Sequence, residues 1–171
     1  MQGENHEAIA RLRADIDGVD AELVRLVARR AALARAIGAS KAPGSPVYRP
    51  EREREVVAKA LAVNAALDDG LDAEALGAFM GEVMSLCRAA EARPRVFYLG
   101  PQGTFTEMAV LRHFGRSVDA VACPTIEAVF HEAESCETGV AVAPVENSTH
   151  GTVVGTLDML FRTPLKIIAE T

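Results

Sequence analysis

One long amphipathic run constrains the fold of this chain more than any other feature. From about His6 to Ile37 no proline interrupts the sequence, and apolar residues recur at spacings of three and four. They are Ile9, Leu12, Ile16, Val19, Leu23, Leu26, Leu33 and Ile37. This pattern predicts a long helix with a packed apolar seam that ends near Gly38. Because so long a helix has few partners in a small domain, we expect it to pair with a second chain.

Two further helices are predicted before residue 92. Pro50 suits a first helical turn, and the second helix should run from there to the Asp68-Asp69-Gly70 stop. A loop from Lys41 to Arg49 that contains Pro43, Gly44, Ser45 and Pro46 precedes it. Asp72 can cap a third helix that reaches about Glu91. The inward stripe of this third helix should be Leu76, Phe79, Met80, Val83, Met84 and Cys87.

The texture of the sequence changes after Ala92, where short β-branched runs begin to alternate with helical stretches. We therefore predict two domains, residues 6–92 and residues 95–171. Strands are expected at 96–99, 118–122, 140–143 and 165–169, and helices at 105–114, 126–134 and 153–161. Alternation of this kind predicts a mainly parallel α/β layer.

Composition excludes several classes of function. The net charge of −6 argues against nucleic acid or anionic membranes as partners, and no apolar run is long enough to span a bilayer. Three Cys without metal or CxxC spacing, four scattered His and no leader pattern favour a reducing cytoplasm with neither metal nor cofactor.

Charged residues interrupt the apolar faces of all three predicted helices. Continuing the seam from Leu26 to Leu33 requires a seam residue at position 30, and that residue is Arg30. An unpaired cation there costs several kcal/mol, roughly, unless it snorkels outward or meets an anion. Four more ionisable residues occupy core-facing or core-edge positions: Arg13, Lys41, Arg52 and Glu53. Glu91 lies at the end of the apolar stripe of the third helix, where an apolar residue is expected. Because cations predominate, a bound small diacid accounts for them most economically.

These residues carry a resemblance to known enzymes. The run Leu12-Arg13-x-x-Ile16-x-x-x-Asp20-x-x-Leu23, with Arg29-Arg30, Lys41 and Tyr48-Arg49-Pro50-Glu51-Arg52-Glu53, resembles the all-helical chorismate mutases. The segments Leu99-Gly100-Pro101-Gln102-Gly103-Thr104-Phe105-Thr106 and Pro144-Val145-Glu146-Asn147-Ser148-Thr149-His150-Gly151 resemble two motifs of prephenate dehydratase. The resemblance implies an intertwined three-helix mutase dimer followed by part of a periplasmic-binding-protein-like lobe, acting in phenylalanine biosynthesis.

The resemblance also implies roles for individual residues. Arg30, and Arg13 from the partner chain, would bind the two carboxylates of chorismate. Lys41 would donate to its ether oxygen, Arg52 would support the anion and Glu53 would hold the hydroxyl. Arg49 replaces an Asp of some relatives and Cys87 replaces a Ser, so a contact from either departs from the family pattern.

Glu91 would face the ether oxygen, where some relatives carry Gln. A Glu donates a hydrogen bond only when protonated, so we expect Glu91 to hold a proton during turnover and activity to fall at alkaline pH.

In the second half, the resemblance implies that Thr104, Glu146, Asn147, Ser148 and Gly151 contact prephenate. Both loops follow predicted strands, at the carboxyl edge where α/β proteins bind ligands. The turn-rich composition of both loops also fits purely structural turns, with Thr104-x-x-Glu107 as a capping box. The dehydratase family continues with a second lobe and a regulatory domain, so we expect no useful dehydratase activity and exposed apolar surface in this chain.

Two other functions fit the sequence less well. A non-catalytic module, with a dimerisation arm and an anion-binding lobe, would bind ligand without turnover. A transcription regulator would need a basic recognition helix, which this acidic chain lacks.

Overall fold

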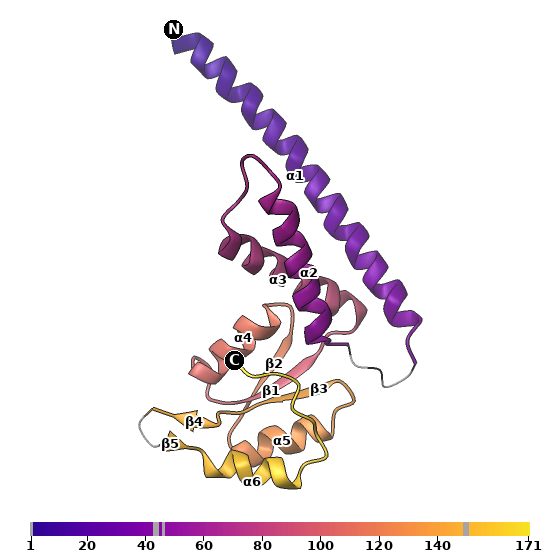
Figure 1. The fold of residues 1–171 in the computed structure, drawn as a ribbon, viewed down its shortest axis with the longest axis vertical. Coiled ribbons are helices and arrows are strands. Elements are labelled where there is room, and N and C mark those ends of the chain that lie inside the picture. Colours follow the sequence, from indigo (N-terminus) through magenta and orange to yellow (C-terminus); the bar gives the residue numbers. More distant parts are fainter. Residues whose placement is uncertain (1, 43–44, 46, 149–150) are drawn as a thin grey trace.

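A computed structural model of the chain describes residues 2–42, 45, 47–148 and 151–171. Part of the predicted loop before the second helix, at residues 43, 44 and 46, lies outside the described residues, as do Thr149 and His150 of the second motif. The elements form a helical half and an α/β half, joined directly after the third helix (Figure 1).

Three helices build the first half, as the sequence predicts. They are α1 (Gln2–Ala39), α2 (Pro50–Ala65) and α3 (Ala73–Glu91). Pro50 opens α2, and the Asp72 carboxylate caps α3 by accepting a bond of 2.8 Å from the amide of Ala75. α3 packs against both other helices, while the N-terminal part of α1 extends beyond the bundle (Figure 1).

The predicted packing of the α1 seam is wrong within one chain. All eight seam residues are exposed, and α1 instead meets α3 through small residues around Ala31, which is buried. Small side chains allow close approach of two helix backbones. Because α1 meets α3 through its face with small residues, its larger apolar residues lie on a different face of α1. They form a continuous apolar stripe along α1: Ile9, Leu12, Ile16, Val19, Leu23, Leu26, Leu33 and Ile37.

The second half contains a parallel sheet in the order β2-β1-β3. Its strands are β1 (Arg95–Leu99), β2 (Asp119–Cys123) and β3 (Gly139–Val142). Helix α4 (Phe105–Phe114) contacts the sheet, and α5 (Ile126–Glu134) packs on it and against α6 (Val154–Arg162) (Figure 1). The parallel α/β prediction is confirmed for the first three strands and all three helices, with boundaries shifted by at most about two residues.

The core of this half has two layers, one on each face of β1. Val96 and Tyr98 pack with Val110 and Phe114 of α4, whereas Phe97 packs with Val129 of α5. The alternation places successive β1 side chains on opposite faces, and α4 and α5 therefore cover opposite sides of the sheet.

The predicted fourth strand is absent from the described residues. Residues 165–169 are extended but pair with no strand, and they cross from the end of α6 towards α4 (Figure 1). The amide of Leu165 donates to the side chain of Thr163 rather than to a strand carbonyl. β-branched composition favours an extended backbone, but a strand also requires a neighbouring backbone in register.

A short hairpin that the sequence analysis did not predict lies in the second motif. β4 (Glu146–Asn147) pairs antiparallel with β5 (Gly151–Thr152), and Asn147 is opposite Gly151. Gly151 has a φ of +69°, a backbone conformation that disfavours residues with a Cβ.

Candidate functional site

The C-terminal end of α3 gathers several of the predicted chorismate-site residues. The ammonium of Lys41, just beyond α1, donates to Oε1 of Glu91 at 2.6 Å. Both side chains are largely buried, with 19% and 12% of their surface exposed. Because the pair is shielded from water, its electrostatic interaction is stronger than that of a surface ion pair.

Gly38 makes this approach of α1 and α3 possible. A Cβ at position 38 would lie 2.5 Å from Cγ of Glu91, far closer than a van der Waals contact. The helix ends at Ala39, one residue after the predicted position, and Gly38 also serves close packing here.

Arg30 is half-buried on α1, two turns before Gly38. Within the described part of the chain, none of the ion pairs involves its guanidinium. Arg13 is exposed on the N-terminal half of α1. Within one chain, therefore, Arg13 does not join the other predicted residues.

Glu53 on α2 turns towards α3 and forms an ion pair with Arg88. Its neighbour Arg52 is exposed and pairs with Glu55 at 2.9 Å, one turn along the same helix. Arg49 is exposed at the start of α2, and Cys87 is buried in the helical packing with 1% of its surface exposed. Of the α2 residues that the sequence singled out, only Glu53 faces the α3 cluster.

Aromatic side chains form one wall beside this cluster. The hydroxyl of Tyr48 lies 2.5 Å from Nε2 of His113, and both rings pack against Phe114. Burial, reinforced by the nearby Glu53 carboxylate, raises the pKa of Tyr48 to about 12. Burial also lowers the pKa of His113, a change that Glu53 opposes and Arg88 reinforces. At neutral pH, the wall is therefore uncharged.

The two predicted prephenate loops lie at one edge of the sheet. β1 and β3 are parallel neighbours, so the loops that follow them leave from the same end. In the first loop, the Thr104 hydroxyl accepts from the amide of Glu107 at 3.4 Å and donates to the carbonyl of Leu99 at 3.3 Å. Glu107 accepts from the amide of Gly103, one residue before the predicted capping-box partner.

A pocket of about 450 Å³ lies at the end of β3, bordered by α4 and the C-terminal segment. Its lining includes Phe105 and Thr106 after the first loop and Pro144 to Glu146 of the second. Glu146, Asn147, Ser148 and Gly151 are all exposed. Glu146 is therefore the one residue of the five predicted prephenate contacts that lines this pocket, and the other four lie outside its lining.

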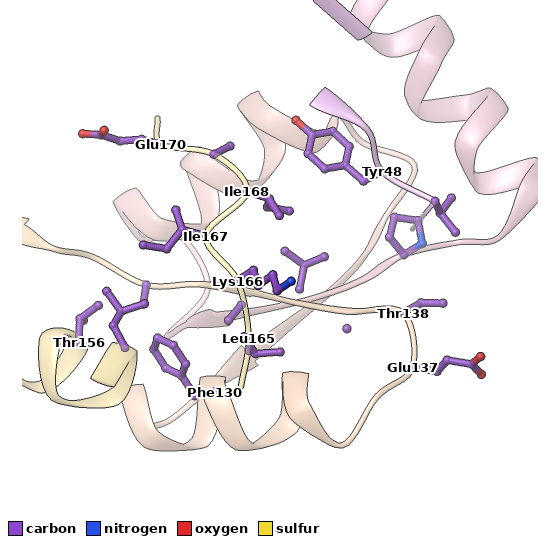
Figure 2. Close-up of a pocket in the computed structure, with 18 of the residues that line it drawn as sticks. Tyr48, Phe130, Glu137, Thr138, Thr156, Leu165, Lys166, Ile167, Ile168 and Glu170 are labelled. Carbon is purple, nitrogen blue, oxygen red and sulfur yellow. The ribbon is translucent and has the colours of Figure 1, made fainter. Parts of the chain in front are cut away.

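A second cavity, of about 640 Å³, lies beside β3 and under the C-terminal segment. Figure 2 shows Phe130 of α5 and Leu165, Ile167 and Ile168 of that segment around it, with Tyr48 at the far end. This mostly apolar lining lacks the clustered cations that a dicarboxylate requires. The cavity is therefore distinct from the charged cluster on α3.

Arg88 is the residue of this region that the sequence analysis missed. It lies four residues after Met84 on the same helix face, and its side chain is buried. The reasoning that singled out Arg30, a cation continuing an apolar stripe, applies equally to Met80, Met84 and Arg88. His113 carried no comparable signal, because its position on α4 fits an ordinary helix surface.

Comparison with known families agrees with this two-part organisation. Residues 12–92 match the family model described as chorismate mutase type II, and residues 96–171 match the one described as prephenate dehydratase. The two halves of the chain thus belong to these two enzyme families, in this order. No helix in the described part of the chain is long and apolar enough to cross a membrane.

Together the two matches assign the chain to the family of bifunctional chorismate mutase/prephenate dehydratases. It is 45% identical to such a protein from Neisseria gonorrhoeae over 91% of the chain and 42% of the relative. It is 41% identical to one from Aquifex aeolicus, over 96% of the chain and 46% of the relative. The chain thus spans less than half the length of these relatives. No solved structure gives a significant match.

Proposed function

We propose that the helical half catalyses the rearrangement of chorismate to prephenate, as a cytoplasmic homodimer in phenylalanine biosynthesis. The observation that carries this proposal is the cluster of buried ionisable groups around the end of α3, inside the segment of the chorismate mutase family. The rearrangement is intramolecular and needs no nucleophile, metal or proton transfer. Holding a flexible dianion in its reactive conformer and stabilising charge on its ether oxygen are the available contributions.

The roles of the residues follow from their chemistry. Arg30 and the Arg13 of the partner chain bind the carboxylates, because a guanidinium is always charged and can grip a carboxylate with two bonds. Lys41 donates to the ether oxygen, Glu91 faces the same oxygen, and Glu53 holds the hydroxyl. Since Lys41 and Glu91 are 2.6 Å apart, they must separate to admit that oxygen. Arg52 contributes positive potential from the rim of the site.

The proposed dimer is supported by the apolar stripe of α1, which no other element of the described chain covers. Pairing of two such stripes removes this surface from water and brings the exposed Arg13 of one chain towards the site of the other.

For the second half, we propose that the loops around the 450 Å³ pocket contact prephenate. Glu146 lines this pocket, whereas Thr104, Asn147 and Ser148 offer hydroxyl and amide groups outside its lining, and Gly151 keeps the backbone of the hairpin accessible. The measurements that test this proposal are binding of prephenate to the purified protein and release of phenylpyruvate from it.

The test of the mutase is the loss of the ultraviolet absorbance of chorismate on addition of the purified chain. We expect turnover, and we expect Arg30→Ala to lower kcat/KM by roughly 10²-fold or more, the effect of losing one preorganised donor. The matched control is Arg35→Ala, which removes an exposed arginine of the same helix. Binding of chorismate without any turnover would instead support the non-catalytic module.

A further inference from the structure

Arg88 is a buried cation at the junction of the two halves of the chain. It belongs to the last turn of α3, and only 4% of its side chain is exposed. Its Nε has no hydrogen-bond partner among the described residues. A buried guanidinium is tolerated only where other groups compensate its charge and its remaining donors. The groups that do so therefore indicate its purpose.

The partners of Arg88 come from both halves of the chain. One terminal nitrogen donates to Oε1 of Glu53 on α2, and the other donates to the carbonyl of Phe114 at 2.5 Å. The guanidinium carbon also lies 5.2 Å from the ring centre of Tyr48 and 5.9 Å from that of Phe114. Two polar contacts and two aromatic faces thus fix the orientation of this side chain.

The contact with Phe114 places Arg88 at the end of α4. Phe114 is the last residue of that helix, so no amide of the helix donates a hydrogen bond to its carbonyl. A cation at a helix C-terminus is also favoured by the helix dipole. α4 begins directly after the Gly100–Thr104 loop, so one rigid helix separates that loop from the Arg88 contact.

The contact with Glu53 leaves this carboxylate reachable. Arg88 engages Oε1, and 24% of the Glu53 side chain remains exposed. A carboxylate held by one oxygen keeps its second oxygen as an acceptor, which is the role that the proposed function gives to Glu53.

We propose that Arg88 is a positioning residue for chorismate, which fixes the carboxylate of Glu53 and makes the site depend on α4 of the second half. This inference rests on the proposed function. It differs from a purely structural role in one measurable respect. Loss of a structural ion pair lowers stability, whereas loss of a positioning residue lowers activity only while the group that it positions is present.

A double-mutant cycle in the full 171-residue chain tests this difference. Arg88→Met, Glu53→Gln and the double variant are compared by kcat and KM for chorismate, with folding followed by circular dichroism. We expect Arg88→Met to lower kcat/KM at least about fivefold more in the wild-type background than in the Glu53→Gln background, because directly contacting groups are coupled. If Arg88→Met does not fold, Arg88→Lys replaces it, since Lys keeps the charge without the fork of donors.

Arg95→Met is the matched control. It removes an arginine whose ion pair with Asp119 is half exposed and includes no residue of the α3 cluster, so kcat/KM should stay within about twofold. Equal effects of the Arg88 substitution in both backgrounds, with an active wild type, would overturn this inference alone. A wild type without turnover would overturn the proposed function and this inference together.

Discussion

At the level of single residues, each carboxylate of the proposed chorismate site is matched by its own cation. Glu91 pairs with Lys41, and Glu53 pairs with Arg88. The half-buried Arg30 is not part of any ion pair within the described residues. A carboxylate of the substrate can therefore pair with Arg30 without displacing a carboxylate of the protein. For this reason the main test of function uses Arg30.

Glu91→Gln tests the contact that we propose between Glu91 and the ether oxygen. The amide of Gln still accepts a hydrogen bond, so it can replace the carboxylate that accepts from Lys41, and its NH₂ group can donate to the ether oxygen. We therefore expect the variant to keep chorismate mutase activity. The measurement is kcat/KM for chorismate, and loss of turnover in a folded variant would contradict the assignment.

His113→Gln tests the pH dependence of stability at the aromatic wall. Burial lowers the pKa of His113 in the folded state, so the unfolded chain binds its proton more readily. The contribution of His113 to stability is complete above its pKa in the unfolded chain, about 6.5. This contribution is lost as the pH falls through the lower pKa of His113 in the folded chain. We expect urea midpoints to fall less between pH 7.5 and pH 5 in the variant than in the wild type.

The control for this comparison is His131→Gln, which replaces a histidine on the exposed surface of α5. The stability of this variant should follow the wild-type pH dependence. A His113→Gln profile that superimposes on the wild type would mean that His113 ionises equally well in the folded and unfolded chains.

At the level of elements, α1 carries an apolar surface that no other element of the described chain covers. Its apolar stripe is exposed along the length of the helix, although each such residue gains roughly 1.5–3 kcal/mol from full burial. In contrast, α3 is covered by α1 and α2 along the bundle and meets the second half at its end. The buried residues of α3 lie in its C-terminal part, whereas the apolar stripe of α1 is exposed along its length, which favours pairing through α1.

Leu26→Glu tests this pairing. Placing a charge in the stripe should weaken association, because the carboxylate would be desolvated in the interface. We expect sedimentation to give the mass of a dimer for the wild type and a shift towards monomer for the variant. Ala32→Glu, which adds the same group on another exposed face of α1, should leave the mass unchanged. A monomeric wild type would contradict the proposed dimer.

At the level of the whole molecule, the two halves meet through a small polar and aromatic junction. Ser85 and Glu82 of α3 accept bonds from the amides of Ser117 and Arg116, in the turn after α4. Arg88 contacts the end of α4 next to them. Gly115 lies at the centre of this turn with a φ of +72°, and a Cβ there would lie 2.5 Å from Cβ of Ser85.

Gly115→Ala should therefore destabilise the contact between the halves. The positive φ and the close approach predict a loss of about 1–3 kcal/mol, measured by urea unfolding. Tyrosine fluorescence reports the junction through Tyr48 and the sheet through Tyr98, because the chain contains no other tyrosine and no tryptophan. Gly81→Ala is the control, since nothing within 4 Å obstructs a Cβ there and Ala favours a helix. Equal stability of the two variants would contradict a tight junction.

Elements with local signals can be predicted from the sequence alone. The three helices of the first half, their caps and the alternation of the second half depend on residue spacing and on neighbours a few positions apart, as Pro50 and Asp72 illustrate. The sequence also indicated the Glu53 and Glu91 positions as ionisable groups in unexpected places.

Contacts between groups that are distant in the sequence depend on how the elements pack. Arg88 could not be paired with Glu53 and Phe114 from spacing, because their contact depends on how α2, α3 and α4 pack. Residues 165–169 have the composition of a strand, yet they remain unpaired because a strand depends on a second backbone. The α1 seam likewise has the periodicity of a packed face, but periodicity does not specify whether the covering surface belongs to the same chain.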